Sequence, residues 1–248
     1  MVGKIAIIGD PDRDRMRRLL AGWVFALALA AVFGLLGRWQ LHRAVEKQAS
    51  LDHVAALLQT RQAKSLAALS LSNDTGYAWA AGSGRFTDTP ALLLDNQRHG
   101  NAVGVHVFRV FQPEHGQTLL VDLGWLALPG DRSLPVDIRP DGLQNLRGLL
   151  LPPPSTGLAL GPAYVVHDAQ RWLLTRVDLA ALSAALHTRL ATRVLRLDPT
   201  LSLGYARDLD VLPNTLPPER HRGYAVQWFG LAIASLVTAL VITLRRRK

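Results

Sequence analysis

The sequence predicts a membrane protein in which two transmembrane α-helices flank an extracytoplasmic α+β domain rich in antiparallel β-strands. Residues 19–37 form a run of 19 residues without a charge, and residues 224–244 form a second such run of 21. Each run is close to the roughly 20 apolar residues that cross about 30 Å of hydrocarbon. Between the runs, short β-prone segments alternate with turn residues, which is typical of a domain built from strands. The predicted parts are a tail (1–18), a first span (19–37), the domain (38–222), a second span (223–244) and a second tail (245–248).

Two alternatives to spanning helices fit these runs poorly. A buried helix of a soluble protein normally keeps a polar face, and neither run has one. A cleaved signal peptide has an apolar region of about 7 to 15 residues followed by a small-residue cleavage site. The first run is longer than that and leads directly into Arg38.

The distribution of charge predicts the topology of the chain. The net charge is +9, of which the two tails carry +6 and the 185 residues between the spans only +3. Short basic flanks stay on the cytoplasmic side during insertion, so both termini are expected in the cytoplasm and the domain outside. Because the positive excess flanks the spans, we expect the lipid bilayer as a partner and no nucleic acid.

Aromatic and acidic residues near the spans refine this prediction. Trp39, Tyr224 and Trp228 fall where an outer belt of interfacial aromatic residues is expected. The first tail contains three aspartates, which a mitochondrial presequence avoids. A bacterial cytoplasmic (inner) membrane with the domain in the periplasm is therefore the predicted location. The chain has no cysteine, which excludes disulfides and thiolate metal sites.

The domain is predicted to begin with a helical stalk over residues 41–58 and to continue as strands. Four strands, expected to form a β-meander, are predicted at residues 77–86, 91–95, 103–112 and 117–128. Four more are predicted at residues 143–151, 163–167, 172–176 and 192–197. Asp178 is a favourable N-cap for a helix over residues 179–190. Pro213, Pro217 and Pro218 predict an extended connector before the second span.

No enzyme signature is present: the chain has no GxSxG, no HExxH, no phosphate-binding loop and no histidine pair at helical ligand spacing. We therefore predict no catalytic residue. Two histidines stand apart by position, because His42 follows the first span closely and His221 immediately precedes the second. With neighbouring arginines and aromatic residues they can be interpreted as a site for a membrane-soluble cofactor or as an ordinary interfacial anchor.

Four stretches of the chain carry motifs that occur together in one protein family. Trp39, Gln40 and Arg43, after the first span, are similar to a WQxxR signature, and residues 220–229 open the second span. Within the domain, residues 94–98 are similar to a DNR segment and residues 120–125 to an LVNRGW segment, followed by Arg132. With these motifs in this order, the chain resembles the Surfeit locus protein 1 family of assembly factors for haem–copper cytochrome c oxidase.

The chain departs from the family pattern in two places. Asp122 and Leu123 stand where the family has Asn and Arg before Gly-Trp, and Val105 stands where an aromatic residue is common. The first departure removes a positive charge whose partner the sequence does not identify. The candidate family-motif residues are Trp39, Gln40, Arg43, Asn96, Arg98, Gly124, Trp125, Arg132, Tyr224 and Trp228.

The resemblance implies a non-enzymatic factor that helps to deliver or position haem a while the catalytic subunit of the oxidase matures. Family members are proposed to use the histidine at the start of the second span as a haem ligand, which corresponds to His221. The implied cofactor is haem a, bound transiently, and its iron is the one metal expected. The candidate haem-binding residues are His221, His42, Arg220, Arg222 and Arg38.

The implied partners are the catalytic subunit of the oxidase and, as a further candidate, haem a synthase. An alternative function from another class is a membrane scaffold that binds the oxidase subunit or haem synthase without binding haem. Its interaction surface would be the β-rich domain. Haem that copurifies with the detergent-extracted protein distinguishes the two hypotheses, since a pure scaffold would be colourless.

Overall fold

The computed structural model describes residues 11–154, 161–211 and 216–245, which fall into two units. One unit contains residues up to Leu51 together with those from Thr215 onward, and the other contains Asp52–Asn214. The first is built from the helices α1 (Pro11–Thr60) and α4 (Pro218–Arg245). The second is the β-rich domain, and the last turns of α1 belong to it.

The two long helices confirm the predicted class of a two-span membrane protein with a central β-rich domain. Both are long and apolar enough to cross a bilayer, and almost none of either apolar window is buried inside the protein. Helix α1 continues without a break through the predicted stalk. Helix α4 begins at Pro218, so this proline lies in the first turn of the helix and not in the connector. Proline suits that position because its missing N–H would have no helical partner there. Pro213 lies outside the described residues.

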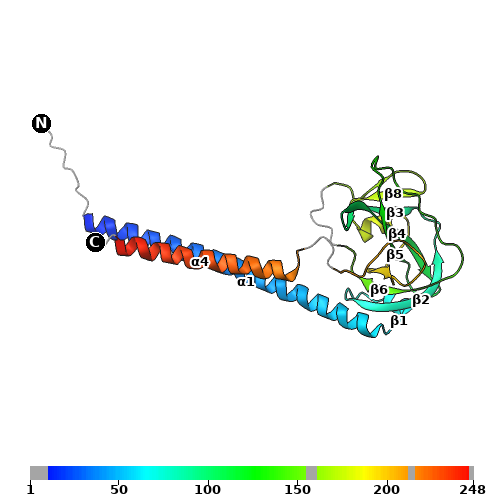
Figure 1. Cartoon of the computed structure of the whole chain (residues 1–248), viewed down its shortest axis with the longest axis horizontal. Helices are drawn as coiled ribbons and strands as arrows, with labels where there is room; N and C mark the ends of the chain where they lie inside the picture. Colours follow the sequence, from blue (N-terminus) through cyan, green and yellow to red (C-terminus); the bar gives the residue numbers. More distant parts are fainter. Residues whose placement is uncertain (1–10, 155–160, 212–215, 246–248) are drawn as a thin grey trace. The chain divides into compact units, whose positions relative to one another are not determined.

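Helices α1 and α4 lie side by side (Figure 1). They contact each other along a seam of small, aromatic and polar residues. Trp23 donates a hydrogen bond to Thr243 at 3.0 Å, and Phe33 stacks on Trp228 with ring centroids 5.7 Å apart. Gly37 leaves room for a phenylalanine of α4, whose ring lies 2.8 Å from the position of an added Cβ. The seam residues of α1 recur at alternating spacings of three and four, as in a left-handed helix pair. They include Trp23, Ala26, Phe33, Gly37, Gln40, Ala44 and Lys47.

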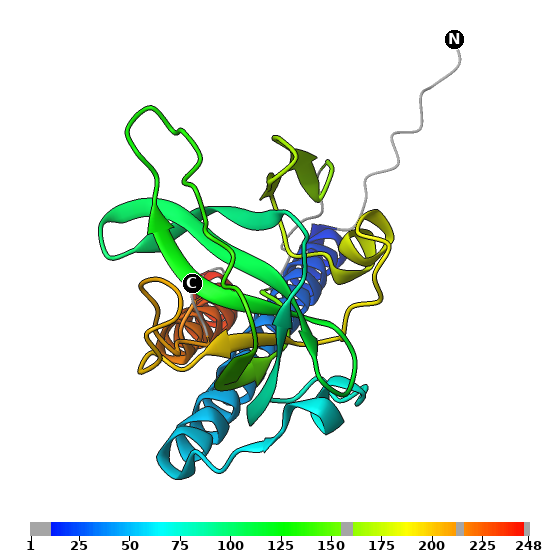
Figure 2. The same ribbon diagram turned by 90° about the vertical axis from the view of Figure 1, so that its right-hand side faces the viewer.

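The strands of the domain form one nine-stranded sheet whose central part closes into a barrel (Figure 2). The closed ring runs β2–β6–β9–β5–β4 and returns to β2, because β4 pairs with β5 along one edge and with β2 at the end of the other edge. Strand β3 pairs with the first part of that other edge and lies outside the ring. Strands β8 and β7 extend the sheet beyond β3. The strand bounds are β1 Lys64–Ser65, β2 Ala78–Phe86, β3 Ala91–His99, β4 Ala102–Pro113, β5 Leu119–Ala127, β6 Gln144–Leu151, β7 Tyr164–Val166, β8 Arg171–Leu174 and β9 Val194–Leu197.

All eight predicted strands are present, but their connection differs from a simple meander. Strands β3, β4 and β5 follow one another as antiparallel neighbours, and so do β7 and β8. Strand β9 inserts between β5 and β6, parallel to the first and antiparallel to the second. The meander prediction is therefore correct for β3 to β5 and wrong for β2, which pairs with β4 and β6 instead of its sequence neighbour β3 and so closes the barrel.

Apolar side chains fill the inside of the barrel and cover two areas outside it. The inner cluster includes Phe86, Val105, Phe111 and Leu195, all buried. An outer cluster lies beneath helix α3 (Leu179–Ala185), whose N-cap Asp178 accepts a hydrogen bond from the backbone N–H of residue 181, as predicted. The helix ends at Ala185, so the predicted end at residue 190 is wrong. A third cluster joins the end of α1 to the barrel through Val54, Trp79 and Leu149. The remaining helix is α2 (Leu66–Ser70).

An irregularity in β5 decides which way its last residues face. The register between β4 and β5 shifts at Val107 and Phe108, and Leu123 is the extra residue. Gly124 takes up the turn with φ +112°, and a Cβ there would lie 2.7 Å from the carbonyl oxygen of Ala206. Only glycine adopts this backbone without strain. As a result, Trp125 pairs with His106 on the outer face of the barrel instead of continuing the inward row.

Candidate functional site at the start of the second span

His221 lies in the first turn of α4, at the seam with α1, and is buried with 7% of its surface exposed. Its Nδ1 lies 2.6 Å from Oε1 of Gln40. Its Nε2 is also buried and has no hydrogen-bond partner in the described part of the chain. Buried polar atoms without a partner are rare in proteins and often indicate a functional role. Of the predicted site residues, the structure thus brings Gln40 and His221 together.

His42 does not share this position. Two residues along a helix correspond to a rotation of about 200°, so His42 faces away from the seam that Gln40 occupies. Its side chain is 73% exposed, and its Nε2 lies 3.2 Å from Glu46. Arg43 pairs with the same carboxylate at 2.8 Å. The prediction that His42 contributes to a haem site therefore gains no support from its geometry and stays a prediction.

Three candidate arginines remain available for an anionic group. Arg38, Arg220 and Arg222 are exposed, and none has a partner among the described residues. Two other basic groups nearby do have partners: Arg43 pairs with Glu46, and Nζ of Lys47 donates a hydrogen bond to the carbonyl oxygen of Leu216 at 2.5 Å. The three free arginines flank the buried pair along the sequence, since Arg220 and Arg222 are neighbours of His221 and Arg38 precedes Gln40 by two residues.

The aromatic residues of the motifs serve two purposes. Trp228 is half-buried against Phe33 and belongs to the seam. Trp39 and Tyr224 are exposed, with 53% and 37% of their surface free. Exposed aromatic side chains at the ends of a span fit the expected interfacial belt.

The family-motif residues of the domain gather at one end of the β3–β4 hairpin. Asn96 occupies a bulge of β3 with φ +57°, and Asp95 beside it pairs with Arg132 at 3.1 Å. Trp125 donates its indole N–H to the carbonyl oxygen of residue 97 at 3.0 Å and packs against His99. Trp125 is half-buried, so it lies beside the core and not within it. Arg98 is exposed nearby, without a partner among the described residues.

Asp122, one of the two departures from the family pattern, is the centre of a buried polar network. Its carboxylate lies 3.0 Å from Nδ1 of His106 and 3.1 Å from Nε of Arg196, and it accepts the N–H of Gly124 at 3.0 Å. Burial alone would raise the pKa of Asp122, but the hydrogen bond to His106 and the charges of His106 and Arg196 outweigh it and lower that pKa. Sequence reasoning missed this network because its members lie on three different strands. The second departure, Val105, is fully buried inside the barrel.

A second buried polar cluster holds the loop between β5 and β6. Arg109 pairs with Asp137 at 2.5 Å, and the same carboxylate accepts a hydrogen bond from the hydroxyl of Tyr205 at 2.5 Å. Burial, followed by the hydrogen bond to Asp137, raises the pKa of Tyr205 to about 12. These contacts tie the loop to the barrel and leave Asp137 no free oxygen.

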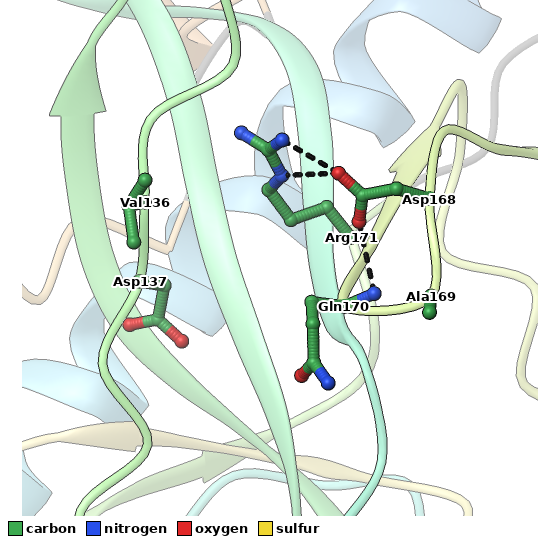
Figure 3. Close-up of a pocket in the computed structure, with 6 residues that line it drawn as sticks. All are labelled: Val136, Asp137, Asp168, Ala169, Gln170 and Arg171. Atoms are coloured by element: carbon green, nitrogen blue, oxygen red, sulfur yellow. Dashed lines mark hydrogen bonds and ion pairs between the residues drawn. The ribbon is translucent and has the colours of Figure 1, made fainter.

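A pocket of about 310 Å³ lies beside this loop (Figure 3). It is lined by Val136, Asp137, Asp168, Ala169, Gln170 and Arg171. Arg171 is paired with Asp168 at 2.5 Å and also donates to the carbonyl oxygen of Leu134 at 2.8 Å. Because its charged groups already have partners, the pocket offers no free nucleophile or acid–base pair. The described residues also contain no group of three potential metal ligands.

Two apolar helices that carry a β-barrel domain between them, with a buried histidine where the second helix begins, define the class of the protein. It is a two-span membrane protein with a buried, unpaired imidazole nitrogen in its helix pair. The model of the SURF1 family matches residues 27–233, and the chain belongs to this family, whose members are assembly factors for cytochrome oxidase. No curated protein sequence matches the chain.

Proposed function

We propose that this protein assists the maturation of haem–copper cytochrome c oxidase by holding haem a transiently through His221, without catalysing a reaction itself. The observation that carries the proposal is the buried Nε2 of His221, which has no partner among the described residues. A neutral imidazole with a free nitrogen is a common haem ligand. Family membership supports the role in oxidase assembly, and the catalytic subunit and haem a synthase are the proposed partners.

The residues around His221 match the chemistry of haem a. Haem a is an amphipathic cargo, with an isoprenoid tail suited to lipid and propionates suited to cations. Arg220, Arg222 and Arg38 can pair with propionates, since charge-assisted hydrogen bonds to carboxylates are among the stronger polar contacts. The helix pair itself supplies an apolar surface for the tail. Nε2 is covered by protein, so iron would reach it only after neighbouring side chains shift.

The test of this function is a haem titration of the full chain in detergent, followed by absorption spectroscopy. His221→Ala is expected to abolish or sharply reduce binding, because the axial bond is lost while the helices remain. His42→Ala is the matched comparison on the same helix pair. Because His42 faces away from the seam, we expect its spectrum to equal that of the wild type, which would remove His42 from the haem-binding candidates. Equal affinity and identical spectra for wild type and His221→Ala would reject the ligand assignment and favour the scaffold without haem.

We further propose that both termini lie in the cytoplasm of a bacterium and that the domain lies in the periplasm. The support is the basic excess of the tails, which keeps short flanks inside. Reporter fusions after residue 10 and after Lys248 should be active only as cytoplasmic reporters, whereas a fusion near residue 140 should be active only outside. A C-terminal fusion that reports from the same side as the domain would contradict this topology.

A further inference from the structure

We propose that Gln40 is a positioning residue that fixes the tautomer of His221, with the proton on Nδ1 and the lone pair on Nε2. This inference deepens the proposed function and depends on it for its purpose, although the tautomer itself can be measured without haem. The inference gives Gln40, the glutamine of the WQxxR motif, a specific structural role, which the sequence alone did not predict.

The first step is the direction of the hydrogen bond between the two helices. Nδ1 of His221 lies 2.6 Å from Oε1 of Gln40. Because a glutamine carbonyl oxygen only accepts hydrogen bonds, this geometry assigns the donor role, and therefore the hydrogen, to Nδ1. The contact joins residues 181 positions apart in the sequence, and it closes only when α1 and α4 are packed together.

The second step concerns the other ring nitrogen. A proton on Nε2 would create a buried donor without an acceptor, because this atom has no partner among the described residues. Such orphaned donors are unfavourable. Protonation of Nδ1 alone satisfies the ring, and Nε2 then presents an unshared electron pair.

The third step is what this arrangement does for a metal. Histidine ligands bind metals through one bare nitrogen, while the other N–H is usually held by a carbonyl or carboxylate oxygen that sets the tautomer and the ring orientation. Gln40 stands in that relation to His221 before any metal is bound. The neutral amide fixes the ring without adding a buried charge to the helix pair, in contrast to a carboxylate.

The seam explains why Gln40 and no neighbouring residue can do this. Gln40 lies between the seam residues Gly37 and Ala44, which are both buried. A glycine and an alanine on either side allow α4 to approach closely, so a side chain of this length reaches the imidazole. Ala225, one turn after His221, is also buried, with 1% of its surface exposed.

The experiment measures the tautomer in the haem-free full chain. The protein is labelled with 15N-histidine in detergent, and a spectrum that correlates the ring nitrogens with the ring carbon-bound protons is recorded. The signal of His221 is identified by its absence in His221→Ala. We expect a protonated Nδ1 in the wild type and in Gln40→Glu, which keeps the acceptor. Gln40→Leu should shift the population toward the Nε2–H form.

Gln227→Leu is the matched control, because Gln227 is an exposed glutamine of α4 without a partner among the described residues. It should leave the His221 signal unchanged. An Nε2–H tautomer in the wild type, or the same tautomer in wild type and Gln40→Leu, would overturn the inference. Equal thermal stability of the two leucine variants shows that a shifted tautomer does not come from a loosened helix pair.

The haem titration separates this inference from the proposed function. If the wild type binds haem, Gln40→Leu should weaken the affinity by about 10 to 100 times, as for other lost partners of metal-binding histidines, and Gln40→Glu should restore most of it. If Gln40→Leu binds haem with the same affinity as the wild type, Gln40 has no role in haem binding. If the wild type binds no haem, the proposed function fails, while the NMR result still decides whether Gln40 sets the tautomer.

Discussion

Replacing Arg196 with methionine should destabilise the domain by about 3 to 5 kcal/mol, because it leaves the buried carboxylate of Asp122 without its guanidinium partner. Both side chains are almost fully buried, with 7% and 2% of their surfaces exposed. For a domain of this size the midpoint of thermal unfolding should fall by roughly 6 to 20 °C. The measurement is the near-ultraviolet circular dichroism of the full chain in detergent as a function of temperature.

The double variant Asp122→Asn with Arg196→Met should recover most of the loss. Asparagine has no charge to bury, and it can still accept the N–H of Gly124. It is also the residue found at this position in the family pattern. Arg132→Met is the control, because the pair of Arg132 with Asp95 is exposed and such pairs contribute about 0 to 1 kcal/mol. A melting curve of Arg196→Met that coincides with that of Arg132→Met would show that the buried pair is not important.

The destabilisation caused by Arg196→Met should be smaller at acidic pH. Because its folded-state pKa is lowered, Asp122 contributes stability above the unfolded value of about 3.9, and this contribution disappears as the pH falls through the folded-state pKa. Wild type and Arg196→Met should therefore differ most near neutral pH and converge as the carboxyl group becomes protonated.

Phe111→Ala should cost about 3 to 5 kcal/mol as well, for a different reason. Phe111 is fully buried inside the barrel, and its ring packs edge-on against Phe86 with centroids 5.1 Å apart. The two residues are also register partners where β2 meets β4 and closes the barrel. Removing the ring leaves a cavity where β2 meets β4. The variant therefore loses the free energy of burying the apolar ring and its van der Waals contacts with the neighbouring side chains.

The control for this prediction is Val165→Ala on the edge strand β7. Val165 is 53% exposed, so the variant removes apolar atoms without opening a cavity. It should melt close to the wild type, whereas Phe111→Ala should lose roughly 6 to 20 °C. A loss of similar size in both variants would mean that the cost does not come from closing the barrel.

The sequence by itself determined the spans and the existence of the strands. Both follow from local chemistry: uncharged runs of sufficient length must be helical in lipid, because every backbone group has to be satisfied within the segment. The same holds for the helix after Asp178, whose side chain caps a backbone N–H three residues away. The resemblance of residues 39–43 and 220–229 to a known family likewise required no structure.

Long-range pairing was not encoded in any local pattern. The order of strands in the barrel depends on β9 joining β5 and β6, and such contacts between distant segments leave no signature in the alternation of residues. The face of Trp125 depends on one extra residue in β5. A single-residue shift moves each following side chain to the opposite face, so the run from residue 119 onward was consistent with a tryptophan inside or outside.

The tertiary structure alone decided which polar residues meet. His42 and His221 looked alike in the sequence, since each lies beside a span and among arginines. The seam between α1 and α4 separates them: Gln40 and His221 fall on it, and His42 falls on the opposite side of its helix. The partners of Asp122 come from β4 and β9 in the same way. Helix phase and strand order fix these contacts, and both are set only when segments far apart in the chain pack together.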